Sequence, residues 1–326
     1  MNFVSYSLTT EDLIRNFDNL LKRFRDLRER TGSGAPIENT KLWTYRKNLD
    51  SLNQMDPLDA AALVGIVNKY CSINSLFDVG EDIKIPEQKL LDLLYGRYLL
   101  QDEDEEYNNT FFELAMALRI SQSMGNEGGI DLSTDCDVIW YDKDLAIECK
   151  YLHSEKKFRK ELSKALDQLE RRLSDGLANM GLVAFDLSNL VDHKIIFEFS
   201  RSTFYAFVKN YECLIERRSI FAQGISEEGV PMSVIQDRNF IKILTSFASH
   251  QLEAVFYRNF KKSELSKLSH NKVGVIFQLN ISLLFEYQGE VIPIPSRAMS
   301  YYINKNINEN KRDRVQKLIH SLATGI

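Results

Sequence analysis

The sequence predicts an α/β fold, and three observations support this prediction. Residues 137–150 alternate apolar and polar side chains around a short polar turn, which is typical of a β-hairpin. Segments 107–124 and 154–174 carry apolar residues at helical spacing and flank that hairpin. An almost continuous apolar run at 180–187 then predicts a buried strand. With a short strand at 130–132, the predicted order is helix, three strands, helix, strand.

The first hundred residues are predicted to be helical. Thr10 can cap the first helix, which a Gly-, Ser- and Pro-containing break at 31–36 follows. Asp56 and Pro57 predict another helix start, since proline suits the first helical position. Helices are expected at about 10–30, 37–52, 56–71 and 86–100.

One face of the first helix carries a short heptad seam. Apolar residues recur at alternating steps of four and three, namely Leu13, Phe17, Leu20, Phe24 and Leu27. We expect this seam to pack within the fold, with a dimer zipper as the alternative. The acidic run 102–106 is expected to be a solvated linker and not a metal site.

The region beyond residue 190 is predicted to mix helices with strands. We expect a strand at 193–199, helices at 202–221, 239–260 and 308–322, and strands at 273–279 and 282–287. These strands could extend the central sheet. The predicted organisation is therefore a helical N-terminal region (1–104), a core (105–190) and a mixed α/β C-terminal region (191–326) that extends the core.

The return strand of the hairpin carries the most informative chemistry. Side chains alternate across a strand, so Glu148 and Lys150 share one face, while Cys149 lies on the apolar face. Asp137 begins the preceding strand, and a hairpin can bring its carboxylate close to that of Glu148. Two convergent carboxylates suit a hard cation such as Mg²⁺. An adjacent ammonium can stabilise an attacking water or the charge of a reacting phosphate.

A spacing of one residue between an acid and a lysine is not specific by itself. The same spacing recurs at 82–84, 87–89, 155–157, 192–194 and 309–311. Only Glu148 and Lys150 lie on an apolar alternating strand that follows a strand beginning with an aspartate. The context distinguishes this motif from the other occurrences.

This pattern resembles the PD-(D/E)XK nuclease superfamily, over roughly residues 107–188. The resemblance implies a restriction-endonuclease-like αβββαβ core in which Asp137 and Glu148 bind the catalytic metal and Lys150 positions or activates water. Glu113 then matches the glutamate that many members add to the metal site from the first helix. Gln168 matches a glutamine on the second helix that contacts the site or the substrate.

Some residues leave this assignment open. Cys136 stands where the superfamily name has a proline, and Asp131 and Asp135 compete with Asp137 for the metal role. The hairpin could instead be a surface element with an ordinary cross-strand salt bridge. Glu113 could be a surface glutamate paired with a neighbour, and Gln168 an ordinary helix-forming residue.

The second helix carries a basic stripe. Four cations lie along one line of that helix together with Gln168, namely Lys157, Lys160, Lys164 and Arg171. A basic stripe beside a metal site suits a phosphate backbone, so we expect it to bind nucleic acid. The alternative is a solvated helix face held by pairs such as Glu161 with Lys164.

The composition is ordinary for a soluble globular protein. The 326 residues are 44% hydrophobic and 27% charged, with a net charge of −5, which argues against a general nucleic-acid coat protein but permits a local basic groove. The four cysteines have no zinc or disulfide spacing, so we expect reduced thiols in a cytoplasmic protein. No Walker loop, signal peptide or membrane-spanning run is expected.

The sequence thus predicts a Mg²⁺-dependent endonuclease, with Mn²⁺ as a substitute. DNA is the expected substrate, because it is usual in the superfamily that the chain resembles; RNA is not excluded. A restriction or anti-phage defence role is expected by the same analogy. The alternatives are a nucleic-acid-binding or assembly subunit that does not cleave, and a repair or recombination nuclease that acts with a partner helicase. A homo-oligomer or another protein partner stays open, and no membrane partner is expected.

Overall fold

A computed structural model of the chain describes residues 10–32, 36–78, 83–100, 105, 107–123, 129–222, 224–225, 229–261, 268–269 and 271–324. Within this part, seven strands form one mixed sheet in the order of the sequence. The strands are β1 (Ile83–Lys84), β2 (Ile130–Asp131), β3 (Val138–Trp140), β4 (Leu145–Tyr151), β5 (Met180–Asp186), β6 (Lys272–Tyr287) and β7 (Glu290–Ile303). The predicted α/β class is confirmed.

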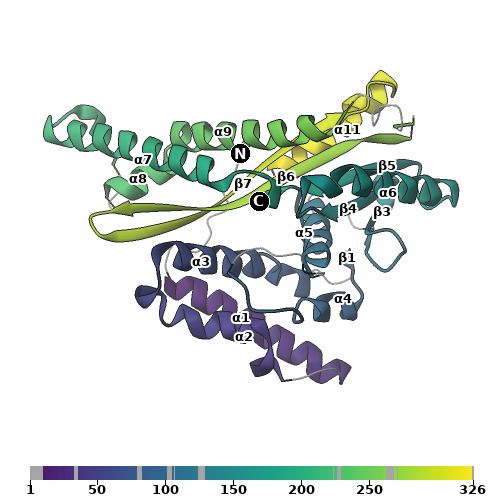
Figure 1. Cartoon of the computed structure of the whole chain (residues 1–326), viewed down its shortest axis with the longest axis horizontal. Coiled ribbons are helices and arrows are strands. Elements are labelled where there is room, and N and C mark those ends of the chain that lie inside the picture. The colour runs from purple at the N-terminus through teal and green to yellow at the C-terminus, as the bar shows by residue number, and fades with distance from the viewer. Residues whose placement is uncertain are drawn as a thin grey trace.

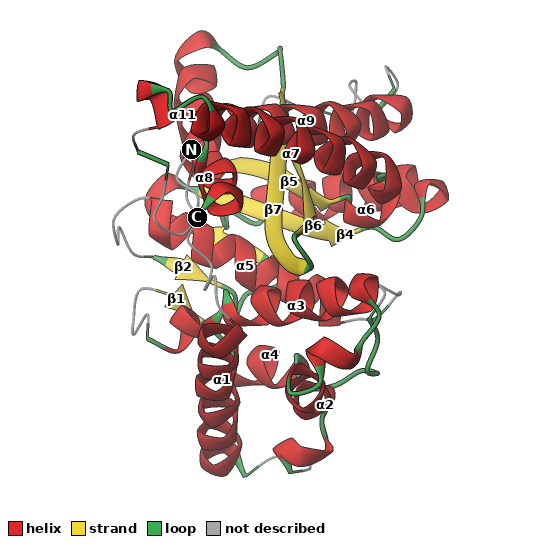
Figure 2. Ribbon diagram, turned by 90° about the vertical axis from the view of Figure 1, so that its left-hand side faces the viewer, coloured by secondary structure: helices red, strands yellow, loops and turns green. Residues whose placement is uncertain are grey.

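Helices cover both faces of this sheet. The helices are α1 (Thr10–Thr31), α2 (Lys41–Leu49), α3 (Pro57–Cys71), α4 (Glu87–Asp92), α5 (Tyr107–Ser123), α6 (Glu155–Ser174), α7 (His193–Glu216), α8 (Val230–Gln236), α9 (Arg238–Asn259) and α11 (Glu309–Thr324). One apolar core joins α1 to α5 and α11 to one sheet face, and a second joins α6 to α9 to the other. Figure 2 shows the sheet between these layers, and Figure 1 shows the N-terminal helices gathered on one side.

The alternation of side chains along the central strands explains the two cores. On β5, Leu182 and Ala184 face the α5 layer, whereas Val183 and Phe185 face the α6 layer. Strands β4, β5 and β6 run parallel to one another, and both of their faces are covered, so these strands are apolar almost throughout. β6 and β7 then continue as a long antiparallel hairpin beyond the rest of the sheet (Figure 1).

The predicted β-hairpin at 137–150 is confirmed. β3 pairs antiparallel with β4, and Val138 lies opposite Ile147. Asp144 closes the turn with a left-handed backbone (φ 54°), a conformation that aspartate tolerates better than most residues. Its carboxylate also accepts a 2.8 Å hydrogen bond from the Asn179 backbone N–H, which ties the turn to the start of β5.

Most of the predicted helices form, and the predicted start of α3 at Asp56 and Pro57 is confirmed, whereas Thr10 is the first residue of α1 and not its cap. Asp56 accepts a 2.9 Å hydrogen bond from the Leu58 N–H at the start of α3. The seam predicted on the first helix is buried within the fold, as expected. The helix expected at 86–100 is shorter, because α4 ends at Asp92. Most of the acidic run 102–106 lies outside the described residues.

Two predictions for the C-terminal region were wrong. Residues 193–199 form the first turns of α7, not a strand, because Asp192 caps a helix there and accepts from the Lys194 and Ile195 N–H groups at 3.0 and 3.4 Å. The two strands expected at 273–287 are one continuous strand, β6. As predicted, the C-terminal strands extend the central sheet, through β6 and β7.

Helix α3 crosses the β6–β7 hairpin at a very close approach. A Cβ atom added at Gly65 would lie 1.9 Å from the Ser282 Oγ and 2.9 Å from its Cβ. A glycine in a helix interior normally weakens the helix by about 1 kcal/mol relative to alanine. Glycine at position 65 therefore permits the close packing of α3 against β6.

We expect Gly65→Ala to destabilise the protein by about 1–3 kcal/mol, because overpacking outweighs the better helix propensity of alanine. The free energy of unfolding is measured by urea denaturation. Adding Ser282→Gly to this variant removes both clashing atoms and should recover part of the loss. A stabilising effect of Gly65→Ala alone would contradict the close approach.

Candidate functional site

The β3–β4 hairpin positions the first carboxylate of the candidate site. Asp137 lies just before β3, and its Oδ2 accepts a 2.7 Å hydrogen bond from the backbone N–H of Cys149 on β4. Cys149 itself is buried against the α5 layer. The carboxylate of Asp137 is thus fixed to the neighbouring strand, close to where Glu148 and Lys150 leave the backbone.

Three of the predicted residues lie together. The Nζ of Lys150 lies 3.3 Å from Asp137 Oδ2 and 3.3 Å from Glu148 Oε2. The Glu148 side chain is fully buried, and those of Lys150 and Asp137 are only 12% and 18% exposed. An ion cluster with so little exposure is not the solvated surface salt bridge that was the alternative interpretation.

Burial and neighbouring charges shift the pKa values of Glu148 and Lys150. Burial, with the nearby Asp137 carboxylate, raises the pKa of Glu148 to about 7, and Lys150 only partly opposes this. Burial acts to lower the pKa of Lys150, but Asp137 and Glu148 outweigh it, and the pKa is raised. The lysine therefore stays charged, while Glu148 exchanges its proton near neutral pH.

Glu113 on α5 is electrostatically coupled to this cluster. Burial and Asp137 raise its pKa to about 6, and Lys89 and Lys150 act in the opposite direction. Its Oε2 is bound by the Nζ of Lys89 on α4, at 2.7 Å. Lys89 was passed over in the sequence because its spacing to Glu87 looked like one of the uninformative acid–lysine occurrences.

The donor set suits a hard cation. Glu148 Oε1 is buried and has no hydrogen-bond partner among the described residues, so one carboxylate oxygen has unused capacity to accept a ligand. Among these residues, no group of three or more His, Cys, Asp or Glu side chains is arranged to hold a metal ion. Mg²⁺ commonly uses only one or two protein carboxylates and keeps several waters, so Asp137 and Glu148 fit it.

Other predicted residues are not joined to this cluster by any hydrogen bond. The Oε1 of Gln168 is buried without a partner among the described residues, so its predicted role stays a prediction. The basic residues predicted to bind nucleic acid, namely Lys157, Lys160, Lys164 and Arg171, are exposed on α6. The opposite side of α6 is buried, as its amphipathic pattern requires.

The two competing aspartates have other partners. Asp131 accepts from the Ser133 N–H and Oγ, both at 2.6 Å, and pairs with Lys84 at 3.2 Å. Asp135 is 85% exposed and lies 3.6 Å from Arg172. These contacts favour Asp137 as the acid that acts with Glu148.

Sequence reasoning did not single out a second group of polar residues, at the carboxyl end of β5 and in the middle of β6. Asp186, Ser188, Gln278 and Asn280 are hydrogen-bonded to one another there and line a large cavity. The signals in the sequence were Asp186 at the end of one apolar run and the polar residues Gln278 and Asn280 inside another. His153, three residues after Lys150, is hydrogen-bonded to Asn189 at 2.9 Å.

Comparisons of the sequence with models of known protein families, with curated proteins and with solved structures find no match. In the part of the chain that the structure describes, none of the helices has the length and apolar character needed to span a bilayer. The four cysteines are free thiols, as expected.

The raised pKa of Glu148 predicts a pH-dependent stability. Between its usual pKa of 4.5 and about 7, the folded protein keeps a proton that the unfolded chain releases, so the free energy of unfolding falls as pH rises through this window. The Glu148→Gln variant lacks this titration. Its free energy of unfolding should therefore fall less than that of wild type between pH 4.5 and pH 8, by on the order of 2 kcal/mol. Urea denaturation at both pH values measures this.

The exposed Glu29 provides a matched control for that experiment. Glu29→Gln should follow the wild-type pH dependence. If Glu148→Gln and Glu29→Gln behave alike, Glu148 ionises as freely as a surface glutamate, and the account of its buried charge is wrong.

Proposed function

We propose that this protein is a Mg²⁺-dependent nuclease with a restriction-endonuclease-like core. The observation that carries the proposal is the position of the Lys150 ammonium, 3.3 Å from both Asp137 and Glu148 in a largely buried cluster. A buried lysine between two acids, with the pKa of Glu148 raised, is an arrangement that favours catalysis over stability.

The order of elements around the cluster supports the same proposal. α5 precedes β2, β3 and β4, and α6 then leads to β5. β2, β3 and β4 pair antiparallel, and β5 pairs parallel with β4. This is the αβββαβ order that the resemblance to the PD-(D/E)XK superfamily implies, and the candidate acids lie on its second and third strands or next to them.

The proposed mechanism assigns a separate task to each residue. Asp137 and Glu148 would hold the Mg²⁺, which when bound makes water a stronger nucleophile at neutral pH and stabilises charge on phosphate. Lys150 stays charged and can bind an anionic phosphate oxygen or orient the attacking water. Glu113 would complete the negative site when Lys89 releases it.

The exposed cations on α6 supply the proposed contact with nucleic acid. Phosphate contacts of this kind give affinity without sequence information, so they suit a backbone-binding surface. DNA is the proposed substrate, and restriction or anti-phage defence is the proposed role, both by analogy with the superfamily.

One observation favours a second function, a nucleic-acid-binding or assembly subunit that does not cleave. Each acid of the site already has a cationic partner, since Lys89 binds Glu113 and Lys150 binds the other two. A cluster neutralised by its own lysines could be purely structural. The cleavage experiment separates the two functions.

We expect the wild-type protein to cleave plasmid DNA with Mg²⁺ or Mn²⁺, and single-stranded DNA and RNA are assayed in parallel. Lys150→Met and Glu148→Gln should each lower the single-turnover rate at least 100-fold, because each removes a group that touches the reacting phosphate, water or metal. Thermal unfolding of each variant checks that the fold is retained.

The matched control is Asp135→Asn, an exposed acid two residues before Asp137. It should cleave at the wild-type rate. Cleavage that survives both site variants would come from another site or from a contaminant. If wild type binds nucleic acid but cuts none of the three substrates with either metal, the non-cleaving function is favoured.

The basic stripe makes its own prediction. Replacing Lys160 and Lys164 with Met should weaken DNA binding, and the slope of log K against log salt concentration should become less negative by about 0.9 for each phosphate that the helix no longer neutralises. Fluorescence anisotropy with labelled duplex at several salt concentrations measures both the affinity and the slope. An unchanged slope would show that this helix face is only solvated.

A further inference from the structure

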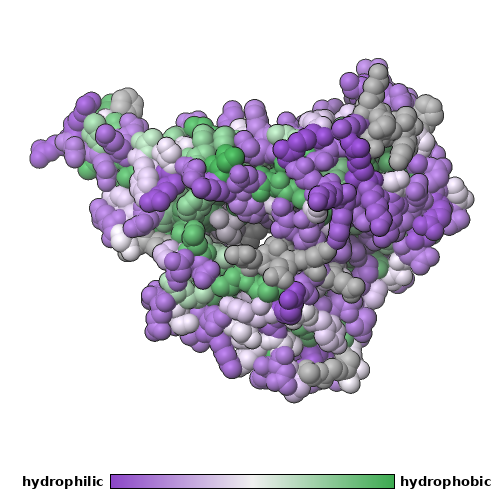
Figure 3. Space-filling model, in the orientation of Figure 1, coloured by the Kyte–Doolittle hydropathy of each residue, from purple (hydrophilic) through white to green (hydrophobic). Residues whose placement is uncertain are grey.

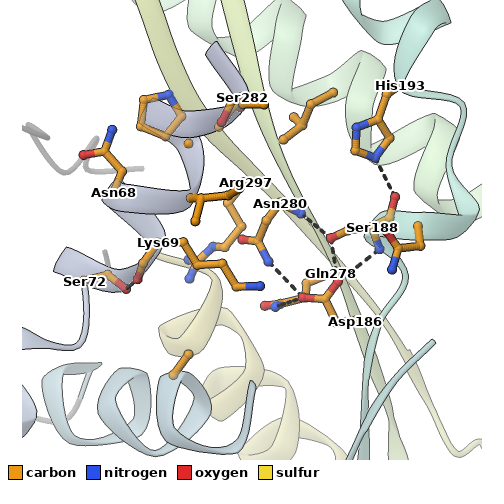
Figure 4. Close-up of a pocket in the computed structure, with 18 of the residues that line it drawn as sticks. Asn68, Lys69, Ser72, Asp186, Ser188, His193, Gln278, Asn280, Ser282 and Arg297 are labelled. Carbon is orange, nitrogen blue, oxygen red and sulfur yellow. Dashed lines mark hydrogen bonds between the residues drawn. The ribbon is translucent and has the colours of Figure 1, made fainter. Parts of the chain in front are cut away.

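A cavity of about 990 Å³ lies between α3 and α5 on one side and the ends of β4 and β5 with the middle of β6 on the other, and α7 and β7 complete its wall. Figure 3 shows a hollow between the N-terminal helices and the rest of the molecule. In Figure 4, side chains from α3, β6, β7 and the segment after β5 gather around the cavity. Its volume is at the upper end of the range for sites that bind small molecules.

The strand register builds the floor of this cavity. Tyr151 lies opposite Asp186, Asp186 opposite Gln278, and Gln278 opposite Met299, so one row crosses four strands. All four residues line the cavity. The parallel strands β4 and β5 both end at this row, whereas β6 continues past it to Tyr287. The carboxyl ends of parallel strands are where open α/β sheets bind ligands.

A closed hydrogen-bond network holds the floor in place. Asp186 accepts from Gln278 at 2.6 Å, from Asn280 at 2.9 Å and from the Ser188 hydroxyl at 2.5 Å, and Arg119 of α5 donates to the Gln278 side chain. Asp186 and Gln278 are each only 2% exposed. A buried network this fully bonded is rigid, and so it forms a preorganised surface.

The cavity lies on the opposite face of β4 from the candidate nuclease residues. Tyr151 shares its face with Cys149, whereas Glu148 and Lys150 point to the other side of the strand. None of the three clustered residues Asp137, Glu148 and Lys150 lines the cavity. The cavity is thus a separate site.

The charge of the lining favours an anion. Five lysine and arginine side chains and two acidic ones line the cavity, in a chain whose net charge is −5. Both acids have cationic or amide partners, since Glu198 lies 3.8 Å from Lys194 and Asp186 is held within the network. Lys69, on α3, makes no ion pair with any carboxylate among the described residues.

The other lining groups suit an aromatic ring with polar edges. Lys69 Nζ lies 4.9 Å from the Phe111 ring centroid and 5.3 Å from that of Tyr151, so aromatic faces adjoin the cation. The Asn280 side-chain oxygen accepts no hydrogen bond from the described residues, although its NH₂ group is bound to Asp186. Asn68, on α3, also lines the cavity.

We propose that this cavity binds a nucleotide, with its phosphate at Lys69 and Arg297 and its base against the aromatic and asparagine side chains. Both cations project into the cavity, from α3 and β7 (Figure 4). The nucleotide is either free or one unit of a nucleic-acid strand, which share this chemistry. Binding here does not depend on cleavage at Glu148, so the two proposals can fail separately.

Isothermal titration calorimetry of the full chain in EDTA tests the proposal without interference from metal-dependent cleavage. The probes are the four nucleoside 5′-monophosphates, a 12-nucleotide single strand and inorganic phosphate. We expect a nucleotide Kd in the micromolar range, and Lys69→Met should raise it at least 10-fold. Glu148→Gln should leave it unchanged.

Lys22→Met, on the exposed face of α1, is the matched control and should bind as wild type does. If Lys69→Met does not fold, Arg297→Met removes the second cation of the proposed phosphate site. Binding of monophosphates identifies a free nucleotide, and binding of the strand alone identifies a nucleic-acid segment. Three results would overturn the proposal: inorganic phosphate that binds as tightly as nucleotides, no binding of any probe, or a nucleotide affinity that the Lys69 and Arg297 variants leave unchanged.

Discussion

The structure around the candidate site depends on the pairing of β3 with β4. That pairing sets Val138 opposite Ile147 and places Asp137 where its carboxylate can accept the Cys149 N–H at 2.7 Å. An interaction with the main chain orients the acid more firmly than contacts between flexible side chains would. The Lys150 ammonium then has a fixed carboxylate on one side and the buried Glu148 on the other.

Charge balance is the constraint that this geometry imposes. Removing carboxylates from water is costly, and a cation repays that cost only when the geometry is good. Here Lys150 forms ion pairs with Asp137 and Glu148, and Lys89 forms one with Glu113. The pKa of Glu148 nevertheless rises to about 7, so the lysines balance the cluster only in part. A further cation that binds this cluster would reduce the remaining repulsion between its carboxylates.

The sequence could predict features that depend on local signals. Alternation revealed the β3–β4 hairpin, and caps such as Asp56 marked helix starts. Residues 193–199 show the limit, because their apolar and aromatic content imitates a strand, while the Asp192 cap and burial at every fourth position make a helix. The cavity could not be predicted, since the row that joins Asp186 to Gln278 exists only after non-adjacent segments pair.

The register of β4 links both candidate sites. Successive side chains on a strand point to opposite faces, so a shift of one residue exchanges the faces of the whole strand. Such a shift would turn Glu148 and Lys150 toward the α5 layer and remove Tyr151 from the cavity floor. The buried apolar residues Ala146 and Ile147 oppose it, because each fills a different core. The same apolar packing that stabilises the sheet therefore holds the ion cluster and the cavity in place at once.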